Sequence, residues 1–138
     1  MQNSQASQLK LLLIEDEEDL ADQLQRFLTK RGFSVQVSYN IKDSLALISQ
    51  QTFDGVLFDR LLPDGDALSV VAEIKQHHQG LLLIMSALGQ VKDRIAGFTQ
   101  DVDYYLPKPV NLDELQALLE RYARLQGLSK QKAQHNAQ

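Results

Sequence analysis

Three carboxylates, one hydroxyl and one ammonium group follow short apolar segments of this sequence. They belong to Glu15, Asp16, Asp59, Ser86 and Lys108. A carboxylate that ends a buried strand, as Asp59 follows Val56-Leu57-Phe58, loses hydration and needs a cationic partner. Carboxylates held close together also repel one another, which raises the pKa of at least one of them unless a cation lies between.

The donor types in this set favour a magnesium site that handles phosphate. Carboxylate oxygens without histidine or cysteine suit Mg²⁺, which keeps several waters and binds phosphate oxygens. A hydroxyl such as that of Ser86 and a cation such as Lys108 can stabilise a phosphoryl group during transfer. By elimination the nucleophile is a carboxylate, and Asp59 is the best placed of the three.

Each of these residues also has an ordinary structural explanation. Asp16 could cap a helix, Asp59 could belong to a turn, Ser86 could be a loop residue and Lys108 could be a solvated side chain. The joint occurrence at four strand ends is what favours a functional site.

The elements that must bring these residues together alternate between apolar and amphipathic stretches about every 20 residues. Apolar runs predict strands at 11–14, 33–37, 56–58, 81–85 and 104–106, and we expect 81–85 to be central. Helical spacing predicts helices from Glu17 to Gly32, around 41–48, from Ala67 to Gly80, around 91–98, and from Asn111 through Leu125. This alternation predicts an α/β fold with right-handed crossovers on a parallel sheet, whose ligands bind beyond the carboxyl ends of the strands.

Length and composition narrow the classes of protein. A chain of 138 residues is enough for one domain, and the absence of cysteine excludes disulfides and thiolate metal sites. A net charge of −4 argues against a surface devoted to nucleic acid. No apolar run is long enough to cross a bilayer, and Met1 to Gln8 show no secretory pattern, so we expect no membrane contact and a cytoplasmic location.

The domain organisation follows from the same pattern. We expect residues 1–8 to be disordered, 9–125 to form one domain, and 126–138 to be a polar, basic tail or linker. The tail is polar and basic and has no apolar periodicity, so we expect no DNA-binding unit in this chain and no DNA binding by it.

Several motifs together resemble the receiver domain of bacterial two-component response regulators, particularly the branch that carries a winged-helix DNA-binding domain. The stretches are "IEDEEDL", "LLPDGD", "DRIAGF" and "DYYLPKPVNLDEL", and the resemblance covers about Leu9 to Leu125. It implies a flavodoxin-like, five-stranded parallel sheet of order 2-1-3-4-5 with helices on both faces. It also implies a signalling domain that catalyses only its own phosphorylation and dephosphorylation.

The resemblance implies roles for individual residues. Asp59 would accept a phosphoryl group from a sensor histidine kinase, with Mg²⁺ as the cofactor. Asp16 and Asp59 would bind the metal directly, Glu15 partly through water, and Leu61 through its backbone carbonyl. Lys108 would pair with the phosphate, and the bond to Pro109 would be cis.

The resemblance further implies a two-state switch and an output surface. Ser86 and Tyr105 would form the switch pair, with the aromatic ring turning inward when the hydroxyl moves toward the phosphoryl group. The output face would span about 90–125, and charged residues there could pair across a two-fold axis in a phosphorylated homodimer. These residues are Asp93, Arg94, Asp101, Asp103 and Arg121.

Two positions depart from the receiver pattern, and three other functions compete with it. Ala67 stands where glycine is common, and Asp101-Val102 stands where Gly-Ala is usual.

A nucleotide- or flavin-binding protein would need a glycine-rich loop after the first strand, where this chain is acidic. A metal-dependent phosphatase often has an acid at the position of Leu61. A receiver-like adaptor that acts without phosphorylation would not need the intact acid, hydroxyl and lysine set.

Overall fold

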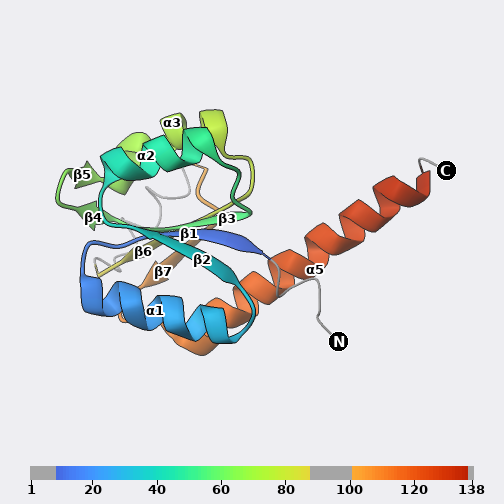
Figure 1. Ribbon diagram of the computed structural model, residues 1–138, viewed down its shortest axis with the longest axis horizontal. Coiled ribbons are helices and arrows are strands. Elements are labelled where there is room, and N and C mark those ends of the chain that lie inside the picture. The colour runs from blue at the N-terminus through green and yellow to red at the C-terminus, as the bar shows by residue number, and fades with distance from the viewer. Residues whose placement is uncertain (1–8, 88–100, 137–138) are drawn as a thin grey trace.

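The computed structural model describes residues 9–87 and 101–136, and five of its strands form one parallel sheet (Figure 1). The strands are β1 (Lys10–Ile14), β2 (Ser34–Ser38), β3 (Gly55–Asp59), β6 (Leu81–Ser86) and β7 (Tyr104–Pro107). Their spatial order is β2-β1-β3-β6-β7, with every neighbouring pair parallel. Counted along the sheet strands alone, this is the expected order 2-1-3-4-5, so the predicted fold class is confirmed.

Burial along the strands explains their composition. All residues of β3 and β6 are buried, whereas β2 at the edge is mostly half-exposed. A parallel strand covered by helices on both faces has to be apolar throughout, which is why these segments read as continuous hydrophobic runs. The run at 81–85 lies inside the sheet as expected, but β3 occupies the middle position and carries Asp59 at its end.

Helices cover the two faces and create two separate cores (Figure 1). One face packs against α1 (Glu18–Lys30) and α5 (Leu112–Asn136). The other packs against α2 (Ile41–Gln50), the 3₁₀ helix η2 (Ala67–Val70) and α3 (Val71–His77). Successive strand residues alternate between the cores because their side chains point to opposite faces: Leu13 and Leu57 face α1, whereas Ile14 and Phe58 face α2.

The structure differs from the sequence prediction in two elements. The third helix begins as η2 and follows a short antiparallel hairpin of β4 (Leu61–Leu62) and β5 (Gly65–Asp66), in which Gly65 adopts a φ of 151°. Helix α5 continues to Asn136 instead of ending near Leu125, and it extends away from the sheet (Figure 1). Residues 126–136 contain no proline and several good helix formers, so a continuous helix replaces the expected loose tail there. The division into domains stays a prediction.

Some predictions concern residues outside the described part of the chain. These are the disordered segment at 1–8 and the helix around Val91, Ile95 and Phe98. Within the described ranges, we find no helix with the length and hydropathy needed to cross a membrane.

The buried imidazole of His78 gives the fold a pH dependence. Its Nε2 lies 2.8 Å from the Leu81 carbonyl oxygen, and burial lowers the pKa of the ring despite this contact. A lowered pKa means that the unfolded chain takes up a proton first, so the contribution of His78 to stability is complete above about pH 6.5 and is lost as the pH falls. We expect wild type to lose about 1 kcal/mol relative to His78→Gln between pH 7 and pH 5 in urea unfolding. An unchanged difference between the two proteins over this range would contradict the prediction.

Candidate functional site

The carboxyl ends of β1 and β3 bring three acids to one place. Glu15, Asp16 and Asp59 each offer a carboxylate oxygen, and these oxygens lie within 4.8 Å of one another. Glu15 is completely buried and Asp59 is 7% exposed, whereas Asp16 is exposed. The sheet thus assembles the three acids that the sequence singled out, because strands that run in parallel end at the same edge.

Lys108 supplies the cation that the buried carboxylates require. Its Nζ lies 2.8 Å from Glu15 Oε1 and 3.3 Å from Asp59 Oδ1. Burial alone would lower the pKa of Lys108, but the hydrogen bond and charge of Glu15, with those of Asp59, raise it. The ammonium group is therefore charged at neutral pH. The Lys108–Pro109 peptide bond is cis, as the resemblance implied.

The pKa of Asp59 is raised to about 6. Burial is the largest cause, and the charge of Glu15 adds to it, while Lys108 acts in the opposite direction. The structure thus holds two buried carboxylates against a single ammonium group, which leaves an excess of negative charge. An added divalent cation would remove this excess.

The donor set fits a hard divalent cation such as Mg²⁺. Glu15 Oε2 accepts a hydrogen bond from the Glu17 backbone N–H at 3.1 Å, whereas the buried Oε1 accepts none from the described residues beyond its ion pair with Lys108. All the ligand atoms are carboxylate oxygens, and the exposure of Asp16 leaves room for water or phosphate oxygens. Leu61 lies two residues after Asp59 with its side chain turned outward, 55% exposed. Its carbonyl as a metal ligand stays a prediction.

The two residues of the expected switch pair are both buried. Ser86 ends β6 and is 1% exposed, and its carbonyl accepts a hydrogen bond from the Lys108 N–H at 2.8 Å. Tyr105 lies in β7, is 8% exposed, and packs in the core on the side of α2 and α3. The ring is thus already turned inward in this structure. Their roles in switching stay predictions.

Two polar residues shortly after Asp59 in the sequence make contacts that the sequence reasoning missed. Arg60 follows Asp59 directly, and its guanidinium contacts both Asp66 and the Tyr105 hydroxyl. Asp64 joins the β4–β5 hairpin to α2, because its carboxylate accepts hydrogen bonds from the N–H groups of Ile41 and Lys42 at 2.9 and 3.1 Å. An arginine directly after the candidate nucleophile was the one available signal.

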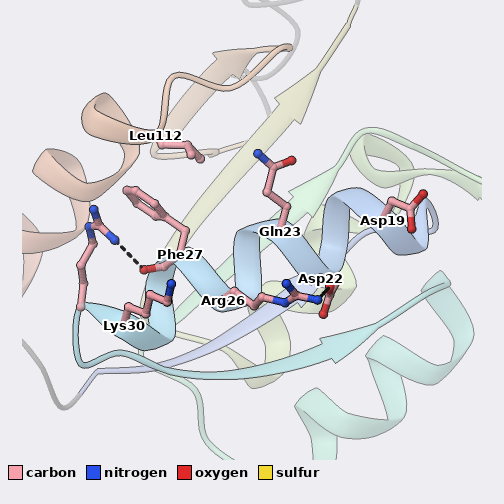
Figure 2. A pocket seen from close by; sticks show the side chains of 8 residues that line it. Asp19, Asp22, Gln23, Arg26, Phe27, Lys30 and Leu112 are labelled. Carbon is pink, nitrogen blue, oxygen red and sulfur yellow. Dashed lines mark hydrogen bonds and ion pairs between the residues drawn. The ribbon is translucent and has the colours of Figure 1, made fainter.

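Two adjoining grooves run from the site along α1. The groove of about 430 Å³ is lined by Lys108, Pro109 and Val110 together with Leu20 of α1. Gln23 and Leu112 belong to both grooves, and the second, of about 480 Å³, is mostly charged (Figure 2). Figure 2 shows Asp22 and Arg26 paired along α1, with Phe27 opposite Leu112. The Arg26 Nη2 atom lies 2.6 Å from Asp22 Oδ2.

The comparison with protein families agrees with this geometry. The model of the response regulator receiver domain matches residues 11–120. The chain belongs to this receiver family. It is therefore a signalling domain of two-component response regulators, the family in which phosphorylation and Mg²⁺ binding are typical.

Individual relatives and solved structures are similar over most of this receiver chain. The transcriptional activator protein PfeR of Pseudomonas aeruginosa is 40% identical over 78% of this chain and 35% of its own length. A Francisella receiver domain matches with a TM-score of 0.81 and 26% identity, covering 86% of this chain and 99% of that one. A Burkholderia pseudomallei response regulator, determined with a phosphorylated aspartic acid and a calcium ion, matches with a TM-score of 0.77 and 25% identity, covering 94% and 75%. The chain spans about a third to a half of the length of the curated relatives it matches.

The two departures from the receiver pattern fit the local structure. Asp101 adopts a φ of 63°, a left-handed conformation that glycine adopts freely and that aspartate tolerates better than most residues. Val102 and Ala67 are buried in the core on the side of α2 and α3.

Only some of the charged residues that we expect at a dimer interface lie in the described part of the chain. Asp93 and Arg94 lie outside the described residues, while Asp101, Asp103 and Arg121 are exposed. Asp103 already has a structural task, because its Oδ2 accepts a hydrogen bond from the Leu82 N–H at 2.8 Å. Pairing of these residues across a dimer stays a prediction.

Proposed function

We propose that Asp59 is the phosphoacceptor of this receiver domain and that its donor is a sensor histidine kinase. A carboxylate oxygen of Asp59 attacks the phosphorus atom, the bond from phosphorus to the donor nitrogen breaks, and the nitrogen keeps the electron pair. The proposal depends mainly on one observation: Asp59 ends the middle strand of the sheet, beside two further acids and 3.3 Å from Lys108.

The chain's own residues provide binding and charge for this transfer. Glu15, Asp16 and Asp59 would hold Mg²⁺, which supplies positive charge to the phosphoryl oxygens. Lys108 would exchange its contact with Asp59 for one with a phosphoryl oxygen, and Ser86 would donate a hydrogen bond to another. Ser86 and Tyr105 would then report the phosphorylated state to the output face, with a homodimer as its consequence.

The groove beside the site supports the approach of a protein donor. Lys108 and Pro109 line its wall together with the apolar side chains of Leu20, Val110 and Leu112. A kinase that carries phosphohistidine has to bring that residue to Asp59, and an apolar groove next to the acceptor gives it a surface to bind. The names of the curated relatives, a transcriptional activator and transcriptional regulatory proteins, support control of transcription as the output.

A metal-dependent phosphatase is the alternative that the acid cluster allows. Phosphatases of this kind often place a second acid two residues after the nucleophile, where this chain has Leu61. Membership of the receiver family favours a single phosphorylation event over continuous turnover.

The proposal is tested by intact-mass measurement after incubation with a small phosphodonor. We expect one addition of about 80 Da, one phosphoryl group, in the presence of Mg²⁺ and none with EDTA, because the excess negative charge repels the donor without metal. The adduct should be lost in acid and in hydroxylamine, as an acyl phosphate is. Borohydride should convert the modified residue to homoserine, which peptide mass spectrometry would place at position 59.

Three outcomes would contradict the proposal. A homoserine at position 16, or 2-amino-5-hydroxypentanoic acid, the reduction product of a glutamyl phosphate, at position 15, would assign another acceptor. An adduct that forms equally in EDTA would remove the metal from the mechanism. Steady release of phosphate from many phosphate esters would favour the phosphatase.

A further inference from the structure

Arg60 connects the strand that carries Asp59 to the aromatic ring of Tyr105. Its Nη1 donates a hydrogen bond to the Tyr105 hydroxyl at 3.0 Å, across 45 positions of sequence. Its Nε and Nη2 lie 3.2 Å from the two carboxylate oxygens of Asp66. The guanidinium therefore uses one side for a bidentate ion pair and the other for the ring, a geometry that its rigid, planar fork favours.

The backbone around Arg60 is also fixed. The Arg60 N–H donates to the Met85 carbonyl at 2.8 Å, and the Arg60 carbonyl accepts from the Ala67 N–H at 2.7 Å. Asp66 additionally caps η2 by accepting a hydrogen bond from the Leu68 N–H at 3.0 Å. Both ends of the ion pair are thus attached to ordered elements, and the Arg60 side chain is only 13% exposed. A guanidinium held in this way offers a donor at a defined place above β7.

This donor stabilises one of the two positions that the ring could adopt. The Tyr105 ring is buried, and its hydroxyl would lose the bond to Arg60 on turning outward. A hydrogen bond from a charged donor contributes enough to change such an equilibrium by roughly tenfold or more. Phosphorylation can move the ring to its buried position only if the phosphoryl group favours that position. If nearly all molecules already have the ring buried, little further change is possible.

We propose that Arg60 is a positioning residue that holds the Tyr105 ring in its buried position before phosphorylation. The contact requires no phosphoryl group, and Arg60 acts from the position next to Asp59. Its importance for signalling rests on the proposed function. In this chain the ring would already be buried before phosphorylation, so that Ser86 would undergo most of the change within the switch pair.

The test follows Tyr105 by NMR in the full chain, with tyrosine labelled with ¹³C at the ring carbon that bears the hydroxyl. The chain has four tyrosines, and the loss of one signal in Tyr105→Phe assigns the relevant one. Spectra are recorded without metal, and then with Mg²⁺ and beryllium fluoride, which mimics a phosphoryl group on a carboxylate. The variants are Arg60→Met and Arg60→Lys. Arg31→Met is the matched control, because Arg31, the C-cap residue that follows α1, also links two elements by donating from Nε to Gln116 Oε1 of α5 at 2.8 Å.

We expect the wild-type Tyr105 signal to be nearly the same with and without beryllium fluoride. In Arg60→Met the ratio of buried to exposed ring should fall roughly tenfold in the free protein, so the Tyr105 signal should move toward that of an exposed tyrosine. Adding beryllium fluoride should return the signal to its wild-type position. Arg60→Lys should give an intermediate shift, because lysine keeps the charge but lacks the fork. Arg31→Met should leave the signal in place.

The outcomes separate this inference from the proposed function. If the Tyr105 signal of the free protein is the same in wild type and in both Arg60 variants, while Asp59 is phosphorylated normally, the positioning role of Arg60 is overturned and the proposed function stands. A signal that depends on Arg60 in a chain that forms no phosphoryl adduct would leave the positioning intact and overturn the proposed function.

Discussion

Replacing Asp59 by asparagine is expected to abolish the phosphodonor adduct and, at the same time, to make the protein more stable. At pH 7 without divalent metal, we expect the free energy of unfolding to rise by about 2 kcal/mol. The reason is that the native state holds the charged carboxylate of Asp59 at a cost, since burial and Glu15 raise its pKa to about 6. The amide removes this charge while keeping the shape of the side chain. Urea unfolding with intact-mass measurement on the same samples gives both results.

The pH dependence of Asp59→Asn has a defined sign. Native Asp59 binds a proton at about pH 6 and the unfolded chain only near its ordinary value of 3.8, so the wild type gains stability relative to the variant as the pH falls through this window. The stability difference should be largest at pH 7 and nearly absent at pH 4. Mg²⁺ should stabilise the wild type more than the variant, because a ligand stabilises the state that binds it.

Asp43→Asn is the control for this prediction. Asp43 is an exposed acid in the first turn of α2, where it accepts a hydrogen bond from Asn40 away from the acid cluster. The Asp43→Asn protein should still form the phosphoryl adduct, and Mg²⁺ should stabilise it as it does the wild type. An Asp59→Asn protein that is less stable than wild type at pH 7 without metal would contradict the account of the excess charge.

Replacing Lys108 by methionine is expected to destabilise the protein by about 3 kcal/mol at pH 7. The substitution keeps an unbranched side chain but leaves Glu15 and Asp59, both buried, without a cation. Because the pKa of Lys108 is raised in the native state, its contribution to stability is fully present at neutral pH and would be lost in wild type only in strongly alkaline solution. In the variant, the pKa of Asp59 should rise above its value of about 6.

Acid and metal should each restore part of the stability lost in Lys108→Met. Lowering the pH protonates the carboxylates, and Mg²⁺ replaces the missing positive charge, so the deficit should shrink in both conditions. Lys42→Met, which removes an exposed lysine from α2, is the matched control and should be nearly neutral. Adding Asp59→Asn to Lys108→Met should recover more stability than it adds to wild type, because the two residues contact each other. Additive effects would show that the ion pair has no energetic importance.

Sequence periodicity was sufficient for the framework of this protein because a parallel sheet covered on both faces leaves a strong signal. The runs that became β1, β3 and β6 are continuously apolar, and the residue after each run can be read directly from the chain. Parallel strands end at one edge, so the meeting of Glu15, Asp59 and Lys108 could be predicted before any distance was known. The end of α5 could not, because the polar residues after Leu125 are compatible with either a helix or a coil.

The amino-acid sequence by itself determined the alternation of strands and helices, the identity of the acids at the sheet edge and the presence of a cation among them, whereas the strand order was implied by the resemblance to the receiver family. Tertiary structure alone decided how charge is divided there: Lys108 contacts both buried acids, Asp16 stays exposed, and the pKa of Asp59 rises. It also decided that Arg60 reaches Tyr105. The physical reason is that periodicity records which face of an element is buried, whereas side-chain pairing and desolvation depend on distances between residues far apart in sequence.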